Sequence, residues 1–302
     1  MTGLVAGVDV GGTKTHIRLA DPRSGLTVAE RTLPSSGWQT RAFRDAAAWL
    51  AERVRPLVPE GERILHLVAG AQGCETEEHC AHLAAELAAG MDVPATVVND
   101  AELLVPAAGL DRGIGLIAGT GAVAVGRHRE TGRYMSAGGW GWVLGDEGSG
   151  SALVRDAARA VLARADEGAG GDELEGALLR SFGVPGLAEL AAVMSWDQGV
   201  ETWGAHAPVV FDAAERGSRL AAGVIRDGGR ALARLVVCLA RRGADSTAVV
   251  AAGGVVVNRP RLREVVEDEL ASRLPGVPVT VLRAPPVRGA VELARRAVRS
   301  EE

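Results

Sequence analysis

The chain contains a strand, a glycine-rich turn and a second strand at two places. Near its start, the apolar run Leu4–Val10 leads into GGTKT and then into HIRLA, where Ile17 and Leu19 alternate with polar residues. Alternation with a period of two after a glycine turn predicts a β-hairpin. The same order recurs at Gly113–His128, which reads GIGLIAGTGAVAVGRH. A repeated hairpin of this kind predicts a duplicated domain.

The first turn is similar to a phosphate-binding P-loop only superficially. Gly7 and Gly12 have the separation of the P-loop glycines, but Thr13 stands where the P-loop requires lysine. A strand also follows the turn where a P-loop needs a helix. The sequence therefore excludes a P-loop.

Strands alternate with helices along the rest of the chain. The sequence predicts further strands at Ile64–Gly70, Ala95–Asp100, Ser246–Gly254 and 277–283. It predicts helices at Arg41–Leu57, 76–89, Ser151–Ala165, 174–194, 260–273 and from Gly289, with more helix between Ala207 and Arg242. This pattern predicts an α/β fold with covered sheets of mixed strand direction. A break near residues 110–114 divides the chain into predicted domains 1–112 and 113–302.

Composition limits the partners and the compartment. The 302 residues are 47% hydrophobic and carry a net charge of −5, with no basic stripe among aromatic residues. We therefore expect no nucleic-acid partner and no membrane partner. The three cysteines form no CxxC pair, which fits a reducing compartment and argues against a zinc site or a disulfide framework. Because no signal peptide and no apolar run of membrane length occurs, we expect a cytoplasmic protein.

The first turn carries groups that bind phosphate. Without a Cβ atom, Gly11 and Gly12 let backbone N–H groups approach an anion closely, while Thr13 offers a hydroxyl and Lys14 a positive charge. Asp9, just before the turn, is placed to hold Mg²⁺ through water, since that ion keeps much of its hydration. The alternative is an ordinary glycine turn after a strand-end aspartate.

The second turn offers a similar cradle. Gly119, Thr120 and Gly121 repeat the pattern, but Ala118 stands where the first hairpin has Asp9. Two cradles on separate domains can hold opposite ends of a polyphosphate. The pair is therefore stronger support for a nucleotide than either turn alone.

Asp100 ends a predicted strand and begins a predicted helix. At a sheet edge that faces a cleft, its carboxylate can accept a proton from a sugar hydroxyl that attacks phosphorus. The alternative is helix capping, although the neighbouring Asn99 could cap instead.

Two further glycine-rich segments are candidate ligand contacts. GGWGWVLGDEGSG at 138–150 lets the backbone approach a ligand, and Asp146 within it can bind vicinal hydroxyls. Of Trp140 and Trp142, one is expected on a sugar face and the other in a core. Gly253 and Gly254 follow a predicted strand and leave space for a flat base, or form an ordinary strand-to-helix turn.

Together these segments resemble the superfamily of sugar kinases, actin and heat-shock chaperones. Within it, the order of DVGGTKT, VVNDAELL, GLIAGTGA, GGWGWVLGDEGSG, VVAAGGVVVN and PPVRGAVELA resembles the branch of N-acetylglucosamine kinases and BadF-type ATPases, from residue 4 to about residue 298. The resemblance implies two ribonuclease-H-like lobes with mixed β-sheets around a central cleft that binds ATP and a sugar. It also implies that the last helix packs back on the first lobe and that a homodimer is possible.

The resemblance assigns roles to individual positions. It makes Asp100 the catalytic base and places it against the sugar. It implies that Gly119, Thr120 and Gly121 form the second phosphate loop, that Ala214 lies near the adenosine, and that Gly139, Trp140, Gly141 and Asp146 bind the sugar. From the residue chemistry, the further expected phosphate and ATP contacts are Gly11, Gly12, Thr13, Lys14, Gly253 and Gly254, the further sugar contacts are Gln72 and Gly138, and the metal contact is Asp9.

One departure from the branch bears on the sugar. Where N-acetylglucosamine kinases carry an asparagine after Ser-Thr, this chain has Ser35–Trp38. Gln72 and the glutamates of AGAQGCETEE could instead favour an ammonium group by charge pairing. We therefore expect an ATP-dependent glucosamine 6-kinase, with N-acetylglucosamine kinase as the alternative.

Two other classes compete with a sugar kinase. A BadF-type activator of a dehydratase needs paired cluster cysteines, which Cys74 and Cys80 do not match. A sugar-responsive repressor needs an N-terminal DNA-binding helix pair, whereas the first predicted strand begins at residue 4.

Overall fold

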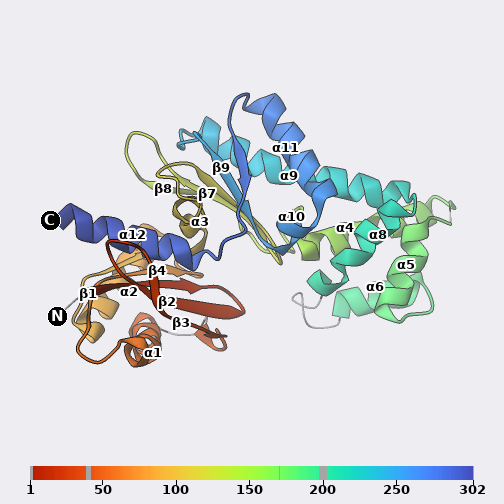
Figure 1. The fold of residues 1–302 in the computed structure, drawn as a ribbon. Helices are drawn as coiled ribbons and strands as arrows, with labels where there is room; N and C mark the ends of the chain where they lie inside the picture. Colours follow the sequence, from red (N-terminus) through yellow and green to blue (C-terminus); the bar gives the residue numbers. More distant parts are fainter. Residues whose placement is uncertain (1–2, 39–41, 170, 197–202, 302) are drawn as a thin grey trace. The chain divides into compact units, whose positions relative to one another are not determined.

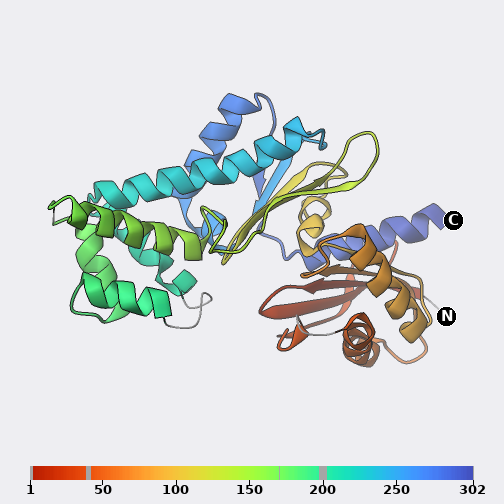
Figure 2. The same cartoon turned by 180° about the vertical axis from the view of Figure 1, so that it is seen from behind.

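The computed structural model describes residues 3–38, 42–169, 171–196 and 203–301 (Figures 1 and 2). The chain forms two compact units. Unit 1 comprises Met1–Gly115, Thr131–Tyr134 and Leu282–Glu302, and unit 2 comprises Leu116–Glu130 and Met135–Val281. Within the described residues, no single helix has the length and apolarity to cross a membrane; only the bent pair Glu173–Phe182 and Leu187–Trp196 has a matching length and composition.

Unit 1 is built on a five-stranded sheet. Its strands are β1 (Gly3–Val10), β2 (Lys14–Ala20), β3 (Thr27–Pro34), β4 (Arg63–Ala71) and β5 (Ala95–Val98), in the order β3-β2-β1-β4-β5. The β1–β2 pair is antiparallel, which confirms the first hairpin, whereas β1–β4 and β4–β5 are parallel. The carboxyl ends of β1, β4 and β5 therefore lie at one edge of the sheet.

Strand alternation directs β1 into two cores. Leu4, Ala6 and Val8 are buried in a core with helices α1 (Phe43–Val54) and α2 (Glu77–Met91). Val5 is buried on the opposite face with helix α12 (Val287–Glu301), which lies along this face in Figure 1. Gly7 faces α12 as well, and a Cβ there would lie 2.7 Å from the backbone N of Val291. Glycine at position 7 thus lets the helix approach the strand closely.

The second sheet repeats the order of the first. Its strands are β6 (Ile114–Ala118), β7 (Ala122–Arg127), β8 (Tyr134–Gly138), β9 (Val249–Ala252) and β10 (Val279–Val281), in the order β10-β9-β6-β7-β8. A first strand in the middle, a hairpin on one side and later strands on the other describe both sheets. This shared order is what the repeated hairpin predicts.

Helices fill the rest of unit 2. The bounds are α4 (Gly150–Asp166), α5 (Glu173–Phe182), α6 (Leu187–Trp196), a short 3₁₀ turn η4 (Gly204–His206), α8 (Ala207–Glu215), α9 (Arg219–Arg241), α10 (Gly254–Asn258) and α11 (Pro260–Arg273). The long helix α9, prominent in Figure 2, is capped by Ser218, whose hydroxyl accepts a hydrogen bond from the N–H of Ala221 at 2.9 Å. Near its middle Gly228 lets the glycine-rich loop pack closely, since a Cβ there would lie 3.0 Å from the Cα of Gly148.

Several sequence predictions need correction. Strands β3 and β8 were not predicted, because β3 is mostly exposed and lacks an apolar alternation. The helix predicted at 174–194 is two helices, since Gly183 takes a left-handed φ of 67° and ends α5. The strand predicted to reach Asp100 ends at Val98 and leads into a 3₁₀ turn, η3 (Asp100–Leu103), and a short helix α3 (Leu104–Ala107).

The remaining boundaries differ by a few residues. The strand predicted at Ser246–Gly254 is Val249–Ala252, and α12 begins at Val287 rather than at Gly289. Helix α1 begins at Phe43, and the predicted start at Arg41 lies outside the described residues. Helix ends are the part of a pattern that side-chain periodicity specifies least.

Candidate active site

The first glycine turn joins β1 to β2 and exposes its middle residues. The N–H of Gly11 donates to the carbonyl of Lys14 at 3.1 Å, and the carbonyl of Thr13 accepts from the N–H of Ser35 at 3.1 Å. Gly12, Thr13 and Lys14 are exposed. The turn therefore presents a cation, a hydroxyl and glycine backbone to solvent.

Gln72 lies directly beside this turn. Its N–H donates to the carbonyl of Val10 at 2.9 Å, and a Cβ on Gly12 would lie 2.7 Å from its Oε1 atom. The indole N–H of Trp38 donates to the carbonyl of Gln72 at 2.8 Å. The side-chain oxygen of Gln72 is buried and has no hydrogen-bond partner in the described protein, so it is a polar group available to a ligand.

Two buried carboxyl groups of unit 1, those of Asp9 and Asp100, have raised pKa values. Burial raises the pKa of Asp9 to about 6, an effect that the charge of Lys14 partly offsets. Burial, the charge of Asp9 and the charge of Glu75 together raise the pKa of Asp100 to about 7. A carboxyl group with this pKa changes its protonation near neutral pH, as a general base for an alcohol must.

The backbone around Asp100 is fixed by its neighbour. The side chain of Asn99 accepts from the N–H of Ala101 at 3.1 Å and caps η3, while Glu102 accepts from the N–H of Asn99 at 3.2 Å. Asn99 thus performs the capping that was the alternative role of Asp100. The carboxylate of Asp100 also accepts from the N–H of Ala101, at 3.0 Å.

Asn99 also holds the loop after β4. Its Nδ2 donates to the carbonyl of Cys74 and to Oε2 of Glu75, each at 3.3 Å. The exposed Glu75 carboxylate is thereby held near Asp100. The sequence pattern placed Glu75 only in a group of glutamates, and its spacing from Asn99 in the chain gave no signal of this bond.

The second glycine turn joins β6 to β7 in unit 2. The N–H of Gly119 donates to the carbonyl of Gly121 at 3.0 Å, and the carbonyl of Gly119 accepts from the N–H of Gly150 at 2.8 Å. Gly150 begins α4, whose N-cap is Ser149. The turn and the N-terminus of a 17-residue helix are therefore adjacent, an arrangement that favours anions.

Gly253 packs tightly on the strand before this turn. It has a φ of 104°, and a Cβ there would lie 2.4 Å from the carbonyl oxygen of Ala118. Gly254 begins α10, where its carbonyl accepts from Nδ2 of Asn258 at 2.9 Å. The two glycine segments predicted to share a nucleotide thus lie together in unit 2.

A pocket of about 420 Å³ opens beside these segments. Its lining residues are Gly119, Thr120, Gly150, Gly204, Ala205, Ala207, Pro208, Phe211, Gly254, Val255, Asn258 and Arg259. The guanidinium carbon of Arg259 lies 5.0 Å from the centre of the Phe211 ring. One end of the pocket is thus the turn and the α4 N-terminus, and the wall contains a flat aromatic and guanidinium surface. Such a pocket has the size and chemistry for a nucleoside with attached phosphates.

The sequence analysis did not single out most of this wall, and its one candidate on α8, Ala214, does not line the pocket. Phe211, Asn258 and Arg259 line the pocket, whereas the predicted Ala214 is buried on α8 and is not a lining residue. An apolar helix pattern does not tell which of its turns borders a cavity.

The glycine-rich loop 138–150 surrounds a buried carboxylate. Asp146 is 9% exposed and has a φ of 60°, and a Cβ on Gly121 would lie 3.0 Å from its Oδ2. Burial raises its pKa, and hydrogen bonds from the backbone N–H groups of Ala122 and Gly141 partly offset this. Its Oδ1 atom has no partner in the described protein. In this structure Asp146 therefore lies beside the second glycine turn, with one oxygen left for a ligand.

The rest of the loop separates its two tryptophans. Trp140 is 74% exposed, whereas Trp142 packs edge-on against Trp203, with ring centres 4.6 Å apart. One indole is thus exposed and the other packed, and the contact of the exposed one with a sugar stays a prediction. Gly138, Gly139 and Gly141 have positive φ values of 75–81°, so the loop depends on glycine for its path. Arg155 of α4 holds the loop by donating to the carbonyls of Trp142 and Gly145.

The predicted site residues therefore form two groups. Asp9, the turn Gly11–Lys14, Gln72 and Asp100 belong to unit 1. The turn Gly119–Gly121, the loop 138–150 with Gly138, Gly139, Trp140, Gly141 and Asp146, and the pair Gly253 and Gly254 belong to unit 2. Within the described residues, no three His, Cys, Asp or Glu side chains form a cluster that could hold a metal ion.

The two sheets share one strand order, and a pocket with the size and chemistry for a nucleotide lies beside the second glycine turn. These two observations fit one class of protein, the phosphate-binding enzymes built on two related α/β units. The chain belongs to the BadF/BadG/BcrA/BcrD ATPase family, whose model matches residues 6–292.

Curated relatives and solved structures agree with this membership. The chain is 27% identical to an N-acetylmuramic acid/N-acetylglucosamine kinase of Clostridium acetobutylicum, over 96% of this chain and 98% of the relative. It is 25% identical to an N-acetyl-D-glucosamine kinase of Dictyostelium discoideum, over 95% of this chain and 96% of the relative. A ROK family glucokinase from Streptomyces griseus, solved with glucose and AMPPNP, has a TM-score of 0.61 and 20% identity, covering 99% of this chain and 100% of the other. A structure from Chromobacterium violaceum, provisionally assigned as an N-acetylglucosamine kinase, has a TM-score of 0.72 and 23% identity, over 96% and 98%. These structures share the α/β sugar-kinase fold that the resemblance implies.

Proposed function

We propose that this chain is an ATP-dependent amino-sugar kinase that phosphorylates the 6-hydroxyl of N-acetylglucosamine. The observation that carries the proposal is the Asp100 carboxyl group, which is held at the start of η3 with a pKa of about 7. The pocket beside the second glycine turn supplies the space for the nucleotide. The names of the two curated relatives support the substrate class.

The reaction needs one proton acceptor and one phosphoryl donor. The Asp100 carboxylate accepts the proton of the sugar 6-hydroxyl as O6 attacks the γ-phosphorus of ATP. The bond from the γ-phosphorus to the β–γ bridging oxygen breaks, and ADP leaves with that oxygen. The products are the sugar 6-phosphate, ADP and a proton, so that atoms and charge balance.

The two glycine turns have the role of phosphate binding in this proposal. Lys14, the Thr13 hydroxyl and the backbone of Gly12 bind phosphate oxygens in unit 1, where the N–H of Gly11 already donates to the carbonyl of Lys14, and the turn Gly119–Gly121 with the α4 N-terminus binds phosphate in unit 2. The Arg259 guanidinium and the Phe211 ring pack against the adenine base of ATP. Charged oxygens are thereby stabilised by fixed donors, which is the main source of catalysis in phosphoryl transfer.

A magnesium site at Asp9 fits the donor chemistry. Asp9 is a hard oxygen donor whose pKa of about 6 reflects an unfavourable buried charge, which a divalent cation would stabilise. One carboxylate is enough, because Mg²⁺ in such sites keeps several waters and binds the substrate phosphates. When bound, the ion would neutralise charge on the phosphates.

The acetamido group is the part of the proposal that departs from the glucosamine expectation. That expectation rested on Ser35–Trp38, where the branch carries an asparagine. In the structure Ser35 is buried, and its Oγ lies 2.7 Å from Oγ1 of Thr15. The Trp38 ring packs against the Trp49 ring, with ring centres 5.7 Å apart. This segment supports the fold of the first turn, so its lack of an amide is weak support for glucosamine, and the relatives favour the N-acetylated sugar.

A substrate panel tests the proposal. A coupled ADP assay with N-acetylglucosamine, N-acetylmuramic acid, glucosamine and glucose is expected to give the highest kcat/KM with N-acetylglucosamine. A preference for glucosamine would restore the first expectation, and ATP hydrolysis that ignores every sugar would contradict a kinase. Stoichiometric iron in anaerobically purified protein would instead favour a dehydratase activator.

A further inference from the structure

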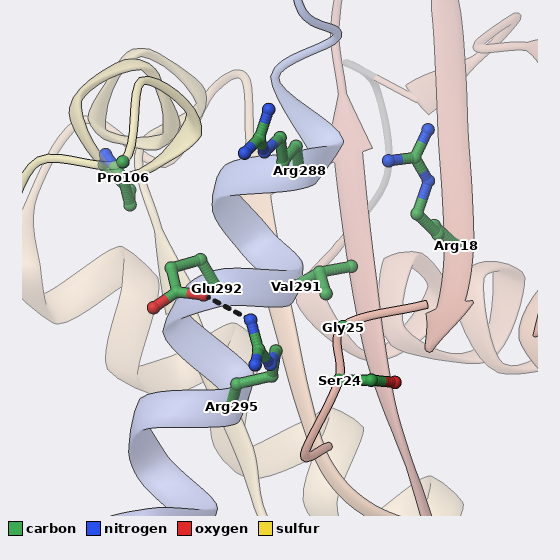
Figure 3. A pocket seen from close by; sticks show the side chains of 9 residues that line it. Arg18, Ser24, Gly25, Pro106, Arg288, Val291, Glu292 and Arg295 are labelled. Carbon is green, nitrogen blue, oxygen red and sulfur yellow. Dashed lines mark hydrogen bonds and ion pairs between the residues drawn. The ribbon is translucent and has the colours of Figure 1, made fainter. Parts of the chain in front are cut away.

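A second cavity in unit 1 lies apart from the proposed site. Its volume is about 360 Å³, and its lining residues are Arg18, Ser24, Gly25, Pro106, Gly109, Arg288, Val291, Glu292 and Arg295 (Figure 3). Ser24 and Gly25 follow the end of β2 that is opposite to Lys14. None of the residues assigned to the sugar, the nucleotide or the metal lines this cavity.

The charge of the lining is predominantly positive. Three guanidinium groups, those of Arg18, Arg288 and Arg295, line the cavity with a single carboxylate, that of Glu292. Figure 3 shows the guanidinium groups of Arg18 and Arg288 on either side of Val291. The chain as a whole carries a net charge of −5, so this concentration of arginine is a local feature.

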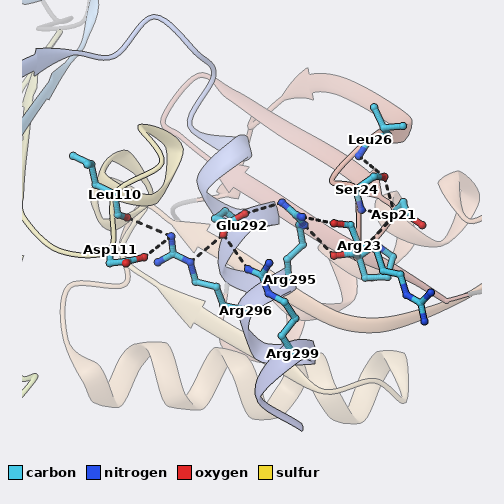
Figure 4. Close-up of polar contacts among 11 residues, drawn as sticks. Asp21, Arg23, Ser24, Leu26, Leu110, Asp111, Glu292, Arg295, Arg296 and Arg299 are labelled. Atoms are coloured by element: carbon cyan, nitrogen blue, oxygen red, sulfur yellow. Dashed lines mark hydrogen bonds and ion pairs between the residues drawn. The ribbon is translucent and has the colours of Figure 1, made fainter. Parts of the chain in front are cut away.

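The single carboxylate is already neutralised. Arg295 donates to Oε2 of Glu292 at 2.9 Å, while Arg296 and Arg299 donate to its Oε1 at 3.1 and 3.2 Å (Figure 4). Burial opposes ionisation of Glu292, but these guanidinium groups outweigh it and lower its pKa. Glu292 therefore stays ionised and occupied by arginine, and it offers little repulsion to an anion in the cavity.

Arg295 is a fixed part of the wall. Its Nε donates to the carbonyl of Pro22 at 3.0 Å and its Nη2 to the carbonyl of Arg23 at 2.6 Å. A Cβ on Gly25 would lie 2.8 Å from its Nη1 atom, so the β2–β3 connection packs directly on this side chain. The cavity is thus bounded by a rigid contact between α12 and the turn at residues 22–25.

The other two arginines have unused hydrogen-bonding capacity. Arg18 uses Nε and Nη2 on Glu30, at 3.1 and 3.0 Å, which leaves its remaining N–H groups free to donate. Arg288 is exposed and makes no side-chain hydrogen bond or ion pair within the described part of the chain. It also lies in the first turn of α12, which contains no acidic residue. A cation at the positive end of a helix is unfavourable by itself, and a bound anion would reverse this.

We propose that this cavity binds a small phosphomonoester. Its phosphate lies between the guanidinium groups of Arg288 and Arg18, and its carbon skeleton packs on Pro106 and Val291. Guanidinium groups match the geometry of phosphate oxygens, and two of them suit a dianion. A volume of about 360 Å³ is within the range of small-molecule pockets and fits one phosphorylated sugar or a compound of similar size.

Calorimetric titration of the full chain tests the site. The probes are inorganic phosphate, glucose 6-phosphate and, as the uncharged control, glucose. Arg288→Ala is the test variant, because the side chain is exposed and is no part of the proposed catalytic machinery. Arg44→Ala, which removes an exposed arginine of α1 on the opposite face of the same sheet, is the matched control.

We expect both phosphate compounds to bind and Arg288→Ala to weaken glucose 6-phosphate by about tenfold or more. Arg44→Ala should leave the dissociation constant within about twofold, and both variants should keep the wild-type melting temperature and basal turnover. Equal binding to wild type and Arg288→Ala would overturn the proposal, as would an equal loss in both variants. These results do not depend on which sugar, if any, the chain phosphorylates.

Discussion

The two sheets share one strand order but differ at their glycine turns. In unit 1 the turn follows Asp9 and lies beside Gln72, and the carboxyl ends of neighbouring strands lead to Glu75 and Asp100. In unit 2 the turn follows Ala118 and contacts the N-terminus of α4. The glycine turn of unit 1 thus lies near carboxylates, which bind protons and cations. The turn of unit 2 lies near a helix N-terminus and a pocket, which suit a phosphate and a nucleotide base. The same strand order therefore supports two different sets of polar groups.

Replacing Asp100, the proposed catalytic base of unit 1, should have the largest effect on activity. Asp100→Asn removes the proton acceptor while keeping the size of the side chain, and we expect kcat to fall by roughly 10²- to 10⁴-fold. The coupled ADP assay measures turnover, and calorimetry measures sugar binding, which should stay within a few-fold of wild type. Near-normal turnover would remove Asp100 from the base role.

On the unit 2 side, the largest expected effect is on stability. Gly253→Ala places a Cβ 2.4 Å from the carbonyl oxygen of Ala118 at a φ of 104°, so we expect a loss of about 2–4 kcal/mol in the free energy of unfolding. Gly276→Ala is the control, since its φ is 84° but no atom lies within 4 Å of its Cβ, and it should cost about 1 kcal/mol. Urea unfolding of both variants makes the comparison, and equal losses would contradict the close packing of Gly253.

Substitutions in the proposed nucleotide pocket of unit 2 should change the KM for ATP and not the KM for the sugar. Arg259→Ala removes the guanidinium beside Phe211, and we expect the KM for ATP to rise about fivefold with little change in kcat. Arg261→Ala, an exposed arginine near the start of α11 that does not line the pocket, should leave both constants unchanged. A rise in the sugar KM alone would assign the pocket to a different ligand.

The smallest expected effect concerns the pH dependence that unit 1 imposes. Asp100 acts in its ionised form, so activity rises with pH through its pKa of about 7. The negative charge of Glu75 helps to raise that pKa, and Glu75→Gln should therefore lower it and move the acidic limb of kcat/KM to lower pH, by less than about one unit. Glu78→Gln, a nearby exposed glutamate, is the control. An unchanged limb in Glu75→Gln would show that burial and Asp9 alone set the pKa.

The glycine turns of the candidate site could be predicted from the sequence, whereas the roles of their residues stay predictions. Gly12 and Gly121 allow close approaches, since a Cβ would lie 2.7 Å from Oε1 of Gln72 and 3.0 Å from Oδ2 of Asp146. Gly253 in addition combines a positive φ with a close approach, which other residues do not accept. The sequence also predicted Asn99 as an alternative to Asp100 for the cap of η3, since Asn and Asp side chains accept hydrogen bonds from local N–H groups. Ala214 and Phe211 show the limit, because both are apolar residues of one helix and only packing decides which borders the pocket.

By itself the sequence determined the first hairpin and its repeat, most of the alternation of strands and helices, and the types of residue placed at each strand end, because these depend on local periodicity and backbone freedom. Tertiary structure alone decided that Asp9 and Glu75 raise the pKa of Asp100, that Asp146 is buried against Gly121, and that Arg18 and Arg288 line one cavity. These features join segments far apart in the chain. Their energies come from burial and from charge at short range, which no linear pattern encodes.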